Sequence, residues 1–127
     1  MADRRAMRVG PDRADVARAR RFVTASLDEW GMSDRDDVAL VTSELVTNAC
    51  EHAGHPIIVT IERDGPRLRL EVSDGSAVLP IVRALDHDRR DGRGMFIVEQ
   101  LTSRWGAEST PDGGKTVWVE FPPDAPA

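Results

Sequence analysis

The spacing of apolar residues changes along this 127-residue chain, and that change restricts the fold more than any single motif does. Up to about Ala53 the apolar residues recur every three or four positions, which is the period of an amphipathic α-helix. After Pro56 they recur at alternate positions, which is the period of a half-buried β-strand. The chain is therefore predicted to combine a helical first part with a strand-rich second part.

Two helices are predicted in the first part. The first spans Asp12 to Trp30 and ends at Gly31, and the second begins at Ser33 and Asp36, a pair that resembles a capping box, and runs to about Ala53. Their apolar positions are Val16, Ala19, Val23, Leu27 and Trp30 in the first, and Val38, Val41, Leu45, Val46, Ala49 and Ala53 in the second.

The second part begins with a predicted hairpin, in which HPIIVTIER and RLRLEVSDG flank the turn DGP. From Gly75 to Asp91 the periodicity is lost, and a loop of this length in a compact domain is usually functional. A third helix is predicted at about Arg93 to Trp105, followed by WGAEST, the turn PDGG and the alternating strand KTVWVEF.

This order of elements predicts the α+β class, a two-layer α/β sandwich with helices on one face of a mixed, mainly antiparallel sheet. One domain is expected from residue 12 to residue 121. We expect residues 1–11 to be a flexible N-terminus and residues 122–127 a disordered tail.

Charge and composition exclude several functions. The net charge of −5, with acidic residues interleaved among the arginines, argues against nucleic acid as a direct partner. Cys50 is the only cysteine, so no internal disulfide can form. No apolar run approaches the roughly 20 residues of a membrane span, and the first residues do not resemble a signal peptide. A cytoplasmic location is therefore expected.

Polar residues follow one line of the second predicted helix. Glu44, Asn48 and His52 lie one turn apart, with Glu51 near the end of the line. A solvated helix face is the ordinary explanation, but asparagine and histidine are poorer helix formers than the residues such faces usually carry. A carboxylate one turn from an amide oxygen suits Mg²⁺ and its waters, and could serve as a base beside a metal-bound phosphate. His52 could equally be a structural residue.

Three later motifs have both an ordinary and a functional explanation. Asp74 and Gly75 end a strand as a simple turn would, but a carboxylate there could also accept a hydrogen bond from an exocyclic amine. Gly92 and Gly94 precede a predicted helix, where backbone amides and the helix dipole favour an anion. Thr116 lies in a strand that a hairpin turn explains adequately.

The succession of these motifs resembles the GHKL ATPase superfamily, which includes histidine kinases and gyrase, over about Asp12 to Phe121. Four segments are similar in sequence to the small stand-alone anti-sigma-factor serine/threonine kinases of actinobacteria: SELVTNACEHA, VSDGS, GRGMFIVEQL and GGKTVWVEF. The resemblance implies the ATP-binding fold of that superfamily, with ATP and Mg²⁺ as cofactors.

The resemblance also implies a role for each matching residue. Glu44 matches the general base, Asn48 the magnesium ligand, and Asp74, with Gly75 beside it, the carboxylate that binds the adenine amine. The matches to the phosphate-binding loop are Gly92, Arg93, Gly94 and Met95. Thr116 matches the strand threonine near the adenine and Asp74, and residues 76–91 match the lid over ATP.

Two departures from the superfamily pattern limit these expectations. The glycine-rich motif after Asp74 is short, since Ser76 and Val78 occupy positions that are often glycine, and this short form is familiar among small bacterial members. No preceding helical hairpin with a phospho-acceptor histidine is visible, nor is a transducer domain, so a complete histidine kinase or a gyrase homologue is not expected.

The function implied is phosphorylation of a serine or threonine in a small STAS-type anti-sigma-factor antagonist, which leaves the kinase to hold a sigma factor. The resemblance also implies a homodimer. Two alternatives remain open from the sequence: a nucleotide-responsive module that sequesters a regulator without phosphoryl transfer, and a plain α+β domain that binds no nucleotide.

Overall fold

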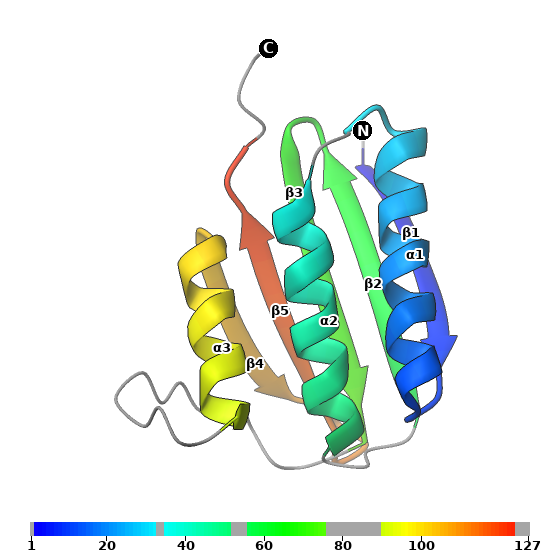
Figure 1. Ribbon diagram of the computed structural model, residues 1–127, viewed down its shortest axis with the longest axis vertical. Helices are drawn as coiled ribbons and strands as arrows, with labels where there is room; N and C mark the ends of the chain where they lie inside the picture. Colours follow the sequence, from blue (N-terminus) through cyan, green and yellow to red (C-terminus); the bar gives the residue numbers. More distant parts are fainter. Residues whose placement is uncertain (1, 33–34, 52–55, 76–89, 124–127) are drawn as a thin grey trace.

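The computed structural model describes residues 2–32, 35–51, 56–75 and 90–123, and the side chains of 90–95 are outside this description. The described residues form three helices and a five-stranded sheet (Figure 1). Their order along the chain is β1 (Ala2–Val9), α1 (Arg13–Glu29), α2 (Asp36–Glu51), β2 (Ile57–Asp64), β3 (Arg67–Asp74), α3 (Arg90–Leu101), β4 (Arg104–Ser109) and β5 (Lys115–Phe121). The predicted α+β class is confirmed.

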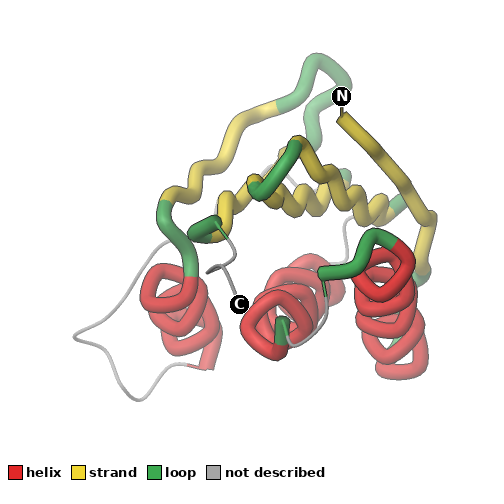
Figure 2. Tube along the Cα trace, turned by 90° about the horizontal axis from the view of Figure 1, so that it is seen from above, coloured by secondary structure: helices red, strands yellow, loops and turns green. Residues whose placement is uncertain are grey.

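The helices lie on one side of the sheet, which makes two layers (Figure 2). The strand order across the sheet is β1-β2-β3-β5-β4. A mixed, mainly antiparallel sheet is expected from the sequence, and every strand pairing in the described residues is antiparallel. The predicted hairpin is β2 and β3, and Gly65 in its turn has a φ of 61°, a conformation that glycine adopts without strain.

The first helix begins and ends as its sequence predicts. At its start the backbone N–H of Asp12 donates to Oδ2 of Asp15, 3.2 Å away. At its end Gly31 has a φ of 72°, and the N–H of Met32 donates to the carbonyl of Leu27 at 2.8 Å. This left-handed glycine with a hydrogen bond back to the last turn is a common way to terminate a helix.

The predicted flexibility of residues 1–11 is wrong for Ala2–Val9, which form the edge strand β1 and pair with β2 along its whole length. Contacts far along the chain hold β1 in place. The guanidinium of Arg5 stacks 5.2 Å from the ring of Trp30, and Arg63 donates to the carboxylate of Asp3 at 2.7 Å. Val9, the last residue of the strand, is buried in the core.

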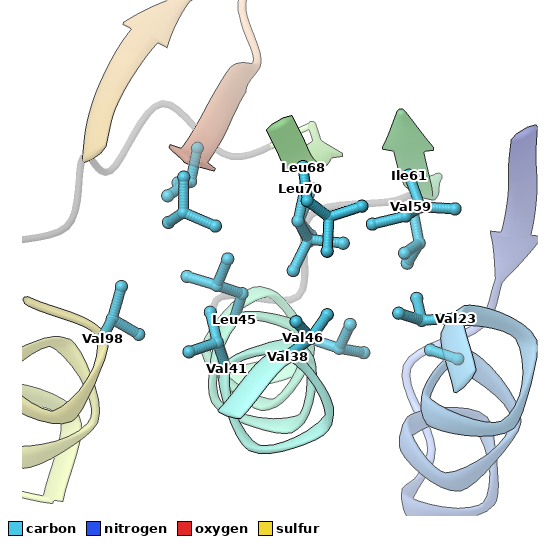
Figure 3. Close-up of a cluster of buried hydrophobic side chains, with 14 of the residues drawn as sticks. Val23, Val38, Val41, Leu45, Val46, Val59, Ile61, Leu68, Leu70 and Val98 are labelled. Atoms are coloured by element: carbon cyan, nitrogen blue, oxygen red, sulfur yellow. The ribbon is translucent and has the colours of Figure 1, made fainter. Parts of the chain in front are cut away.

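Aliphatic side chains fill the space between the two layers (Figure 3). The helix-facing side of the sheet contributes Val59, Ile61, Leu68 and Leu70, while the helices contribute Val23 from α1, Val38, Val41, Leu45 and Val46 from α2, and Val98 from α3. Helix α2 is central, because it contacts both neighbouring helices and also β2 and β3. No described helix is long and apolar enough to cross a membrane.

The third helix differs from its prediction at both ends. It begins at Arg90 instead of Arg93, and it ends at Leu101 instead of Trp105, which belongs to β4. The backbone N–H of Ser103 donates to the carbonyl of Glu120 at 2.8 Å, so the chain joins β5 as soon as the helix ends. Residues 76–89 of the predicted lid, together with His52, Ala53 and Ser33, lie outside the described residues.

The two faces of α2 give a test of this packing. Leu45→Ala removes a side chain that is 2% exposed, so we expect the free energy of unfolding to fall by about 2–5 kcal/mol. Leu40→Ala is the matched control, because Leu40 is 43% exposed on the same helix, and its effect should stay within about 0.5 kcal/mol. Urea denaturation measures both, and equal losses would contradict the orientation of α2.

Candidate functional site

The predicted site residues gather at one end of the molecule. The last turns of α2, the end of β3, the start of α3 and the start of β5 all lie at that end (Figure 1). Glu44 and Asn48 belong to α2, Asp74 is the last residue of β3, and Thr116 is the second residue of β5. Segments far apart in the sequence are thus brought together around the end of the sheet.

Helix α2 presents Glu44 and Asn48 one turn apart on the same side. Asn48 is 9% exposed, while Glu44 is only partly buried and remains in contact with solvent. Burial raises the pKa of the Glu44 carboxyl above its ordinary value, and repulsion from Glu51 raises it further. A partly buried carboxylate with a raised pKa is a suitable proton acceptor near neutral pH.

Asp74 points into the space between the sheet and the helices. Side chains alternate along a strand, and Leu68, Leu70, Val72 and Asp74 are the buried, helix-facing set of β3. The carboxylate is 1% exposed, and the side-chain ammonium of Lys115 lies 3.4 Å from its Oδ2 atom. A charged pair is therefore buried at the end of an otherwise apolar face. Gly75 follows it directly and is exposed.

Thr116 does not lie beside Asp74 as expected. Its hydroxyl forms a hydrogen bond with the hydroxyl of Ser73 at 2.8 Å, and these two residues are paired in the β3–β5 register. Ser73 and Thr116 are each one position away from Asp74 and Lys115, so alternation turns them toward the open face of the sheet. The residue of β5 that does meet Asp74 is Lys115.

Lys115 is a residue that motif reasoning missed, although a signal for it was available. Val117, Val119 and Phe121 alternate on the buried face of β5, and the same alternation continued backwards places Lys115 on that face. A lysine is ordinarily assumed to be exposed, because lysines are almost never fully buried unless they are paired. Here the pairing with Asp74 accounts for the burial.

Gly114 allows β5 to start close to the end of β3. A Cβ atom at this position would overlap the carbonyl oxygen of Asp74 and would lie 3.1 Å from the Cα atom of Gly75. Only glycine therefore permits this approach of the two backbones. The approach is what places Lys115 across from Asp74 in the register.

The predicted phosphate-binding residues lie inside α3, whereas the family resemblance implies a loop there. Gly92, Arg93, Gly94 and Met95 all follow the first helical residue, Arg90. The first four N–H groups of an α-helix, counted from its N-cap residue, have no acceptor within the helix, and inside α3 these include residues 90–92. The amide of Gly92 thus remains suitable for an anion, whereas those of Arg93, Gly94 and Met95 are within the helical hydrogen-bonding range.

A family comparison decides what this arrangement is. The family model described as the histidine kinase-like ATPase domain matches residues 9–121. The chain belongs to this family. None of the curated proteins searched matches the chain. The match begins at Val9 and so leaves most of β1 outside it.

The residues of this histidine kinase-like ATPase domain fit a magnesium nucleotide. Asp74 offers a buried acceptor for an exocyclic amine, the start of α3 offers amides for phosphates, and Asn48 offers an amide oxygen for a cation. Among the described residues no group of three or more carboxylate, histidine or cysteine side chains could hold a metal by itself. Mg²⁺ held by Asn48 would take its remaining ligands from phosphate oxygens and water.

The raised pKa of Glu44 predicts a pH-dependent stability. Because the folded chain holds this proton more tightly than the unfolded chain does, ionisation of Glu44 costs stability as the pH rises above the carboxyl's ordinary value of 4.5. Glu44→Gln removes that loss. We expect the melting temperature of Glu44→Gln to rise relative to the parent between pH 4.5 and neutral pH.

Glu51→Gln is the matched control, since it removes only the smaller, repulsive cause of the raised pKa. Its effect should have the same direction and a smaller size. A stability difference between Glu44→Gln and the parent that shrinks as the pH rises would contradict the assignment.

Proposed function

We propose that this chain is an ATP-dependent serine/threonine protein kinase that acts as an anti-sigma factor. Membership of the histidine kinase-like ATPase family supports ATP binding. The observation that carries the proposal is the position of Asp74, buried and helix-facing at the end of the sheet where the last turn of α2, which carries Asn48, and the start of α3 also lie. The partners are proposed from the motif resemblance: a STAS-type antagonist as substrate and a sigma factor as the regulated protein.

Each site residue has a role in the proposed phosphoryl transfer that follows from its chemistry. Bound ATP supplies the transferable phosphoryl group. Asp74 accepts a hydrogen bond from the adenine amine, and the amides of the first turn of α3, among them that of Gly92, stabilise phosphate charge. Asn48 holds Mg²⁺ through its amide oxygen. Glu44 takes the proton from the serine or threonine hydroxyl of the antagonist.

Glu44 is the feature that favours a kinase over a module that only sequesters a regulator. A nucleotide can be bound without a base at this position, whereas transfer to a hydroxyl needs a proton acceptor. Its carboxylate is partly exposed, so a substrate hydroxyl can reach it, and its raised pKa makes it a stronger proton acceptor than an ordinary carboxylate.

Nucleotide binding gives the first test. ATP with Mg²⁺ at about 100 times its dissociation constant should stabilise the chain by about 2.7 kcal/mol, measured as a rise in melting temperature. Asp74→Asn replaces the carboxylate by a neutral amide, and we expect it to weaken ATP binding by roughly tenfold or more. Asp64→Asn is the control, since Asp64 is exposed at the end of β2, beside the start of β3 and far from its last residue, and this variant should bind as the parent does. If the parent shows no ATP-dependent stabilisation, the proposal fails.

Phosphoryl transfer gives the second test. With labelled ATP, Mg²⁺ and a STAS-type antagonist, the parent should label the antagonist on serine or threonine. Glu44→Gln should bind ATP normally and transfer label about 10²–10⁴ times more slowly. If the variant labels as fast as the parent, Glu44 is not the base. If the parent binds ATP and captures the antagonist without labelling it, the chain is a sequestering module.

A further inference from the structure

Lys115 has a property that the proposed function does not explain. It is the only lysine in the chain, because the 17 basic residues comprise this lysine and 16 arginines. Its side chain is 1% exposed, and its ammonium lies 3.4 Å from the equally buried carboxylate of Asp74. The one lysine ammonium of the chain is therefore held at the carboxylate to which the proposed function assigns the binding of adenine.

Stability alone is a poor reason for this pair. Replacing a buried ion pair by packed apolar side chains is often neutral or stabilising, because removing two charges from water is costly. The preceding residue pair on the same face of β3 and β5 is Val72 and Val117, so an apolar pair is already accommodated beside this position. The ion pair is better explained by recognition of a ligand.

The two groups together match the edge of an adenine ring. Adenine carries its amine between two ring nitrogens, N1 and N7, so a hydrogen-bond donor lies beside an acceptor on either side. Asp74 presents an acceptor and Lys115 a donor on the same inner face of the sheet. An ammonium has three N–H donors, so one that contacts a carboxylate can also donate to a second acceptor.

We propose that Lys115 is a base-recognition residue, whose ammonium donates to a ring nitrogen of adenine while Asp74 accepts from the neighbouring amine. This rests on the proposed ATP site. The ammonium also balances the carboxylate charge while the neutral base is bound, because an unpaired buried carboxylate would be costly. A compact ammonium on a flexible stem suits a single ring nitrogen better than the planar guanidinium used elsewhere in the chain.

Ligand analogues test the donor role without altering the protein. Isothermal titration of the parent with ATP, 1-deaza-ATP and 7-deaza-ATP, all with Mg²⁺, removes one ring nitrogen at a time. We expect one of the two analogues to bind about ten- to a hundredfold more weakly than ATP, the range for a hydrogen bond to a charged donor. If all three bind with equal affinity, the inference is wrong while the ATP site stands. If the parent does not bind ATP, the proposed function fails first and the inference with it.

Lys115→Met keeps the length of the side chain and removes the donor. We expect it to bind ATP more weakly than the parent and to lose the discrimination between ATP and the analogue. Arg67→Met is the control, since Arg67 is exposed at the opposite end of β3, and it should keep both properties of the parent. If Lys115→Met still binds ATP more tightly than the weaker-binding analogue, Lys115 is not a recognition residue. If it binds ATP more tightly than the parent does, Lys115 instead competes with adenine for Asp74.

A spectroscopic measurement keeps the inference testable if Lys115→Met does not fold. Because the chain has one lysine, a ¹⁵N-labelled sample has a single lysine side-chain resonance. Saturating ATP should shift this resonance. The weaker-binding analogue, also at a saturating concentration, should shift it less. An unchanged resonance with ATP bound would overturn the inference.

Discussion

The pairing of β3 with β5 determines the chemistry at the end of the sheet. The two strands are separated in sequence by α3 and β4, yet they are neighbours in the sheet, with Asp74 opposite Lys115 and Ser73 opposite Thr116. A shift of one residue in either strand would reverse its inward and outward side chains. Gly114 allows this register where the two strands come closest, since a Cβ atom there would overlap the carbonyl oxygen of Asp74. The backbone thus decides which side chains face the helices.

The two faces of the sheet carry different kinds of side chain. The helix-facing side carries the apolar core and ends in the Asp74–Lys115 pair. The open side is held by charges of opposite sign on neighbouring strands, with Arg69 and Arg104 over the ring of Trp118 and both ion-paired with Glu120. The layer that stabilises the domain is therefore also the one that encloses the candidate base-binding carboxylate. Helix α2 contributes to both, because its apolar face packs on the sheet while Asn48 lies in its last turn and Glu44 one turn earlier.

Sequence reasoning succeeded where periodicity and termination signals agreed. Gly31 follows the end of helix α1 and Gly65 lies in the β2–β3 turn, both as predicted, and both have a positive φ that glycine adopts without strain. Strand β1 was not predicted, because the apolar residues of ADRRAMRV do not alternate cleanly with its polar residues. Contacts such as Arg5 over Trp30 hold it, and local sequence does not contain them.

The candidate site was predictable in its residues more than in its geometry. Glu44, Asn48 and Asp74 could be selected by type and spacing, and the fold brings their elements to one end. The choice of Thr116 over Lys115 followed the motif and not the alternation of β5, although that alternation was readable from Val117 onward. The start of α3 was placed three residues late because glycines at 92 and 94 look like the end of a loop, whereas the helix includes them.

The most direct test of the account is a crystal structure of the chain with Mg²⁺ and a non-hydrolysable ATP analogue. The account predicts the adenine on the helix-facing side of the sheet, with its amine within hydrogen-bond distance of Asp74, and the phosphates at the first turn of α3. A nucleotide bound on the open face beside Thr116 and Trp118, or one whose base does not touch Asp74, would contradict it.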